Sequence, residues 1–241
     1  MKALRLLGIV LAVITLMSAC VSNKHRTEDP EKAATIYADL GLQYLRQGNL
    51  ELALVKLERS LELDSKHPDA NHYIAEVYKQ MGNTVMAEEY YKKAVRYDGD
   101  NPMLLNNYGA FLCEQGRFKE SEGYFLKAAK VPTYRTPELA YENLALCALQ
   151  SDNQAKAEEY FRKALQIRPT LPKSLYQMAL ISYDKKEYLK ARAFIERFHE
   201  LGQTEQSLTL GVKIEEALGD EVAANKYREA LSSQFSDTGK K

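Results

Sequence analysis

Residues 87–94 read Ala-Glu-Glu-Tyr-Tyr-Lys-Lys-Ala, and residues 157–164 read Ala-Glu-Glu-Tyr-Phe-Arg-Lys-Ala. In both segments an aromatic residue stands four positions after the first alanine, and a second alanine stands seven positions after the first. Positions four and seven residues apart lie on one face of an α-helix, because the helix has about 3.6 residues per turn. The two near-copies therefore predict a helix with a small-large-small buried face that recurs along the chain.

Small residues mark six copies of this unit. The first helix of each copy carries one at Gly41, Ala75, Gly109, Ala145, Ala179 and Gly211, at spacings of 34, 34, 36, 34 and 32 residues. The second helix carries them at Ala53, Ala87, Ser121, Ala157, Ala191 and Ala223, and again at Ser60, Ala94, Ala128, Ala164 and Ala230, where only Phe198 breaks the pattern. Large residues lie between them at Leu57, Tyr91, Phe125, Phe161, Ile195 and Tyr227. Small side chains let paired helices approach closely, and a period near 34 residues is typical of tetratricopeptide repeats.

We therefore expect an all-α tetratricopeptide solenoid, a right-handed superhelix of about six antiparallel helix pairs. The repeat domain is predicted at residues 32–235, with repeats at 34–67, 68–101, 102–137, 138–171, 172–203 and 204–235, and a polar tail at 236–241. The first helices of repeats one to three end at Gly48, Gly82 and Gly116, as helix C-termini favour. Repeat five has Lys186 at that offset, and two prolines between residues 130 and 137 predict a longer loop before repeat four.

The N-terminus has the features of a bacterial secretion signal. Residues 1–19 combine Lys2 and Arg5 with an apolar run over 6–17, and a cysteine, Cys20, follows two small residues. The run is too short to span a bilayer. Residues 17–20 resemble a lipobox, although Met17 stands where leucine is usual. That resemblance implies a diacylglycerol and an N-acyl chain on Cys20, and several acyl chains anchor a protein stably.

Two other interpretations of the N-terminus stay open: an ordinary secretory signal with a chance cysteine, and a segment that stays in the membrane as an anchor. Residues 20–31 are polar and unpatterned, so we expect a short tether there. Val21 follows the lipidated position. The resemblance to sorted lipoproteins implies delivery to the outer membrane, because the retention signal for the inner membrane is typically aspartate at that place.

Composition argues against several functions. The chain has 33 basic and 33 acidic residues, so it lacks the basic surface that nucleic-acid binding needs. Its four histidines, at positions 25, 67, 72 and 199, show no metal or triad spacing. The Glu-Glu pairs of the second helices recur with the repeat and indicate solvated helix faces. We expect no catalysis, metal, cofactor or small-molecule substrate.

Function is therefore expected on the first helices, which line the inner surface of such repeats. The candidate groove positions are Ala38, Leu42, Leu45, Arg46, His72, Glu76, Lys79, Met103, Asn106, Ala110, Cys113, Tyr176, Leu180 and Tyr183. Leu42 and Leu45 would present an apolar patch that favours a protein partner. The alternative is that the tether or neighbouring side chains cover this pair.

Cys113 and Cys147 lie on the first helices of adjacent repeats, in the oxidising compartment that a secretion signal implies. Stacked first helices could bring the two thiols together, so we predict a disulfide. The alternative is two free buried cysteines that behave as small apolar residues.

Two stretches carry a more specific resemblance: Tyr-Ala-Asp-Leu-Gly-Leu-Gln-Tyr-Leu at 37–45 and Asn-Asn-Tyr-Gly-Ala-Phe-Leu-Cys at 106–113. Together with the lipobox, tether and six repeats, they resemble the type IV pilus biogenesis lipoproteins, the PilF/PilW pilotins. The resemblance covers essentially the whole chain.

The pilotin resemblance implies a lipoprotein held on the periplasmic face of the outer membrane of a Gram-negative bacterium. It implies that the protein binds type IV pilus secretin subunits and promotes their localisation and multimerisation in that membrane, and hence pilus biogenesis and twitching motility. One alternative is a repeat lipoprotein subunit of the β-barrel assembly machinery. Another is an enzyme or regulator that uses the repeats only for docking.

Overall fold

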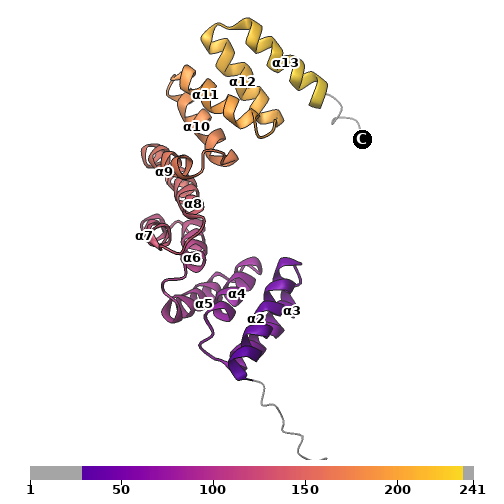
Figure 1. The fold of residues 1–241 in the computed structure, drawn as a ribbon, viewed down its shortest axis with the longest axis vertical. Helices are drawn as coiled ribbons and strands as arrows, with labels where there is room; N and C mark the ends of the chain where they lie inside the picture. The colour runs from indigo at the N-terminus through magenta and orange to yellow at the C-terminus, as the bar shows by residue number, and fades with distance from the viewer. Residues whose placement is uncertain (1–28, 236–241) are drawn as a thin grey trace, which may run out of the picture. The chain divides into compact units, whose positions relative to one another are not determined.

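The computed structural model describes residues 29–235, which form twelve α-helices and no strand, so the all-α prediction is confirmed for this part of the chain. The chain divides into two compact units, residues 1–87 and 88–241. Each unit is built of antiparallel helix pairs (Figure 1). None of the described helices is long and apolar enough to cross a bilayer.

The first unit contains α2 (Pro30–Arg46), α3 (Leu50–Leu63), α4 (Pro68–Gln80) and the first turn of α5 (Thr84–Tyr97). Helix α2 packs against both α3 and α4. It begins two residues inside the predicted tether, because the Asp29 carboxylate accepts a hydrogen bond from the Glu31 N–H at 3.2 Å and Pro30 takes the first helical position. The rest of the predicted tether, Cys20 and the signal segment lie outside the described residues, as does the 236–241 tail.

The second unit contains the rest of α5 and eight further helices. These are α6 (Pro102–Glu114), α7 (Phe118–Lys130), α8 (Pro137–Gln150), α9 (Gln154–Ile167), α10 (Pro172–Asp184), α11 (Tyr188–His199), α12 (Glu205–Leu218) and α13 (Glu221–Phe235). Each even-numbered helix pairs with the helix that follows it, and α8, α10 and α12 also pack on the second helix of the preceding pair. The first helices of this unit start within one residue of the predicted repeat starts, whereas α2 starts four residues before the predicted start of repeat one; the expected loop separates α7 from α8.

The small positions lie where paired helices cross most closely. A Cβ atom on Gly41 would come within 2.4 Å of Leu57 Cγ, and one on Gly109 would come within 3.1 Å of the Phe125 ring. The equivalent alanines of repeats two, four and five are fully buried. The structure therefore supports the physical reason for the repeating pattern, which is close contact between helix backbones.

Turn chemistry closes the helix pairs. Gly48, Gly82 and Gly116 adopt positive φ angles of 72–76°, a conformation that glycine adopts without strain. Repeats four and five reach the same conformation with Asp152 at 57° and Lys186 at 61°. The turn geometry is thus a property of the repeat, and it is imposed even on residues that have a Cβ atom.

Candidate functional site

The predicted groove positions of the first unit are only partly accessible. Arg46 is exposed, and Leu42 and Glu76 are half-buried. Ala38 and His72 are both 1% exposed, and Leu45 is 8% exposed. The prediction that Leu42 and Leu45 form an exposed apolar pair is therefore wrong for Leu45. Helix α2 contacts both α3 and α4, and Ala34, Ala38, Gly41 and Leu45 are its buried residues.

His72 does not offer a charged contact to a partner. Burial lowers its pKa from 6.5 to about 4; the nearby Asp69 carboxylate opposes this shift and Lys79 adds to it. Its Nε2 atom lies 3.8 Å from Glu76 Oε1 on the next turn of α4. His72 is therefore a buried neutral side chain at neutral pH, and Glu76 and Lys79 are the accessible polar groups beside it.

The groove positions of the second unit are more open. Met103 is 49% exposed. Asn106 Oδ1 accepts a hydrogen bond from Asn143 Nδ2 at 3.2 Å, which links the first helices of repeats three and four. Ala110 is half-buried and packs against the apolar core of repeats three to five. The half-buried rings and aliphatic chains of Tyr176, Leu180 and Tyr183 line α10.

Cys113 and Cys147 are joined by a disulfide, with their Cα atoms 5.9 Å apart. The bridge links α6 to α8 directly, and both cysteines are nearly inaccessible, at 6% and 3% exposed. The predicted groove position Cys113 is consequently a cross-link between repeats. The structure favours the disulfide over the alternative of two free cysteines.

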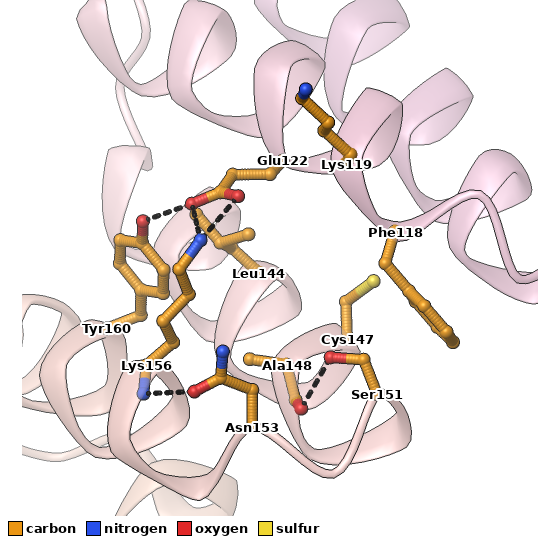
Figure 2. A pocket seen from close by; sticks show the side chains of 10 residues that line it. All are labelled: Phe118, Lys119, Glu122, Leu144, Cys147, Ala148, Ser151, Asn153, Lys156 and Tyr160. Atoms are coloured by element: carbon orange, nitrogen blue, oxygen red, sulfur yellow. Dashed lines mark hydrogen bonds and ion pairs between the residues drawn. The ribbon is translucent and has the colours of Figure 1, made fainter.

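A pocket of about 370 Å³ opens on the other side of this disulfide, between α7 and α9 with α8 as its floor (Figure 2). The Glu122 carboxylate lies at its centre, where it pairs with Lys156 Nζ at 2.8 Å and accepts a hydrogen bond from the Tyr160 hydroxyl at 2.7 Å. These bonds, that from Lys156 above all, hold the pKa of Glu122 below its usual range. Glu122, Lys156 and Tyr160 thus satisfy one another.

Glu122 belongs to a ladder of ion pairs that joins successive repeats of the second unit. Glu88 pairs with Arg117 at 2.6 Å, and Glu158 pairs with Lys185. At the last junction the charges are reversed, because the second helix supplies the cation. Arg192 pairs with Glu215 and, at 3.2 Å, with Asp220. In each of these second helices, the residue that pairs with the next repeat is the one directly after the first small position of the helix.

Sequence reasoning treated these glutamates as solvated. The second glutamate of each Glu-Glu pair does behave so: Glu89 and Glu159 bond a lysine one turn away on their own helix. The first glutamate bridges to the next repeat. The first glutamate recurs with the repeat period, and this recurrence was the one sign of the ion pairs in the sequence. Its partner lies a different number of residues further along the chain each time, so the sequence pattern alone did not reveal the pairs.

Candidate metal sites are absent among the described residues: no group of three or more His, Cys, Asp or Glu side chains in 29–235 could hold a metal ion.

Comparison with known proteins identifies the repeats directly. Models of the tetratricopeptide repeat match residues 41–82, 68–101 and 100–170. The type IV pilus assembly protein PilF of Pseudomonas aeruginosa is 36% identical over 198 residues, which cover 82% of this chain and 79% of PilF. An uncharacterized protein of Haemophilus influenzae is 30% identical over 152 residues, 63% of this chain and 85% of its own length.

Solved structures give the same relationship. A structure from a functional characterization of Pseudomonas aeruginosa PilF matches with a TM-score of 0.78 and 34% identity, over 88% of this chain and 96% of that one. PilW, described as a widely conserved type IV pilus biogenesis factor, matches with a TM-score of 0.72 and 29% identity, over 86% and 95% of the two chains.

Proposed function

Because the chain belongs to the PilF family of tetratricopeptide repeat proteins, we propose that it acts in type IV pilus biogenesis as a pilotin. In this role it binds secretin subunits through its first helices and promotes their localisation and multimerisation in the outer membrane. Twitching motility then depends on it. It acts as a lipid-anchored scaffold, without catalysis, cofactor or small-molecule substrate.

The family relationship is the single observation that carries this proposal. Two relatives of known structure, PilF and PilW, are named for type IV pilus assembly and biogenesis, and each match spans more than four fifths of this chain. Neither the repeats nor the anchor signal would separate a pilotin from a subunit of the β-barrel assembly machinery. The names of the relatives favour a role in pilus biogenesis.

The lipid supplies location in this proposal. Cys20 stands nine residues before Asp29, which caps the first described helix. An extended chain spans at most about 3.6 Å per residue, so an anchor at Cys20 keeps the first unit within roughly 30 Å of the leaflet. A bound secretin subunit would share that confinement, which raises its local concentration and favours multimerisation.

The accessible part of the first unit supplies the contact. Leu42 is half-buried on α2, Arg46 is exposed one turn further along, and Glu76 lies half-buried on α4. An apolar side chain beside charges of both signs suits a polypeptide segment better than a small anion. Further along the chain, Met103 adds an apolar side chain that is 49% exposed.

The anchor is tested with Cys20→Ala in a piliated strain. We expect a folded protein that no longer partitions with the outer membrane, and a loss of heat-stable secretin multimers there. Val21→Asp is the matched control: it keeps the lipid but should retain the protein at the inner membrane, with the same loss of multimers. Normal outer-membrane multimers with both variants would contradict the delivery role.

The surface is tested with Leu42→Gln and Arg46→Glu. Each should weaken secretin binding several-fold with little change in the melting temperature. Val55→Gln on α3 is the control, because Val55 is 55% exposed and lies outside the first-helix surface. Leu45→Gln is expected to lower stability, since that side chain is buried. If the surface variants instead lost porins generally and kept normal pili, the protein would belong to the β-barrel assembly machinery.

A further inference from the structure

The last repeat junction contains an open trough between α10 and α12. One part, of about 340 Å³, is lined by Tyr176, Leu180 and Leu210 together with polar residues of α12. A second part, of about 270 Å³, reaches to Phe198 at the end of α11. Both parts share Tyr176 and Gln206, so they form one continuous apolar depression on the first-helix surface.

Two positions of α12 explain why this junction is open. Gln206 and Lys213 are exposed. At the same two offsets, the first helices α6, α8 and α10 carry residues that are fully or nearly buried by the preceding repeat: Leu104, Ala140, Ser174, Phe111, Cys147 and Ile181. Repeat six thus presents exposed polar side chains at offsets where its predecessors present buried ones, and the trough lies beside them.

Phe198 contributes to the same opening. It occupies the one position at which the small-residue pattern of the second helices is broken. Its ring packs with Tyr176, with a distance of 5.7 Å between ring centroids, and forms a wall of the trough. The other repeats have alanine or serine at this position, so the phenyl ring adds apolar surface that they lack. The departure from the pattern therefore builds an apolar surface.

The trough carries unpaired positive charge. Lys173 and Lys213 line its two parts, both are exposed, and neither forms an ion pair within residues 29–235. Glu205 is the one acidic residue that lines the trough among the described side chains, so the excess charge at its edge is positive.

We propose that this trough is a docking site for an extended peptide segment of a partner protein that carries an apolar side chain next to a carboxylate. The apolar side chain packs between Tyr176, Leu180 and Phe198. The carboxylate pairs with Lys173 or Lys213, which complements the local charge. This site lies in repeats five and six, includes neither Leu42 nor Arg46, and does not depend on the proposed secretin contact.

The test is selection from a library of random dodecapeptides displayed on phage, with the full-length chain in detergent as bait. We expect enriched peptides to combine an aromatic or aliphatic residue with an acidic residue within two positions. In fluorescence anisotropy titrations of the enriched peptides, Lys173→Glu and Lys213→Glu should each weaken binding by about threefold, and the double variant by about tenfold. A pocket-filling variant, Gln206→Trp, should abolish binding.

Lys226→Glu is the matched control, because Lys226 is an exposed lysine of α13 that does not line the trough. It should leave affinity unchanged, and all five variants should keep the wild-type helical circular dichroism. Three results would overturn the proposal: no enrichment over bait carrying Gln206→Trp, enrichment of basic or purely polar peptides, or equal losses of affinity with Lys226→Glu and Lys213→Glu. Enriched peptides that still bind when the trough is filled would place the site elsewhere.

Discussion

The junction between repeats three and four and the junction between repeats five and six are both tied by an ion pair, Glu122–Lys156 and Arg192–Glu215, but they differ on the first-helix surface. At the first, a disulfide joins α6 to α8, and Glu122 ties α7 to α9 through Lys156. At the second, the two positions that are buried in the earlier first helices are occupied by the exposed Gln206 and Lys213. The small and large motif positions fix each helix pair, whereas residues outside the motif decide whether neighbouring pairs close against each other.

The largest expected effect comes from breaking the closed junction. The disulfide spans a sequence separation of 34 residues, so its loss in Cys113→Ser/Cys147→Ser should lower the free energy of unfolding by about 3 to 4 kcal/mol. Urea unfolding measures the loss, and hydrogen exchange should locate it in α6 and α8 rather than in α12. A reductant should reproduce the effect in the wild-type protein and change nothing in the variant. Equal stability of both proteins would mean that the bridge adds nothing to closure.

A smaller effect is expected from overpacking within each repeat. An added Cβ at Gly109 would meet the buried Phe125 ring at 3.1 Å, and one at Gly211 would meet Tyr227 at 3.0 Å. Phe125 is 1% exposed and has no room to shift, whereas Tyr227 is half-buried on the terminal helix. After the gain in helix propensity, Gly109→Ala should cost about 1 kcal/mol and Gly211→Ala close to nothing. Thermal melting measures both, and the reverse order would contradict the comparison.

Relief of turn strain should produce a gain of similar or smaller size. Lys186 and Asp152 both hold positive φ angles, at 61° and 57°. Aspartate tolerates this conformation better than lysine. Lys186→Gly should therefore raise the free energy of unfolding by up to about 1 kcal/mol, and Asp152→Gly by less. Lys185→Gly is the control, since Lys185 has φ −77° and should gain nothing.

Acid should weaken the open junction before the closed one. Burial lowers the pKa of His199, although its contact with Ser207 opposes the shift, so the unfolded chain binds more protons once the pH falls below about 6.5. The stability that neutral His199 provides is complete above that pH and decreases below it. Glu122 has a lowered pKa, so its contribution is complete above 4.5 and is lost only at lower pH.

Hydrogen exchange, corrected for intrinsic rates, tests this order. Protection in α11 and α12 should begin to fall as the pH drops below 6.5, while α8 and α9 keep theirs until the pH is below 4.5. In His199→Gln the first decrease should disappear. Simultaneous loss of protection in all four helices would mean that the junctions do not open separately.

Much of the fold could be predicted because the same local sequence features occur in each of the six repeats. Glycine and alanine at fixed offsets mark helix crossings, and the prolines at residues 68, 102, 137 and 172 stand at the first turn of a first helix. Even the departure at Lys186 leaves the turn in place, since the flanking helix pair dictates its conformation. The disulfide was predictable as well, because its two cysteines lie on adjacent first helices.

Accessibility could not be predicted in the same way. Position within the repeat suggested that Ala38, Leu45 and His72 face a partner, but all three are buried. Burial depends on which helices pack on α2 and α4, and the sequence of one repeat does not encode the side chains of its neighbours. The ion-pair ladder was missed for the same reason, because Glu88, Glu122 and Glu158 pair with residues at different offsets.

The sequence by itself determined the helix pairs, their turns and the family, since each depends on residues close together in the chain and on a period that repeats. Only the tertiary structure decided which junctions close and which side chains stay accessible. The same phenylalanine that interrupts the pattern at position 198 becomes the wall of a trough because a non-local neighbour, Tyr176, packs against it. Exposure results from packing between repeats, and only the folded chain specifies it.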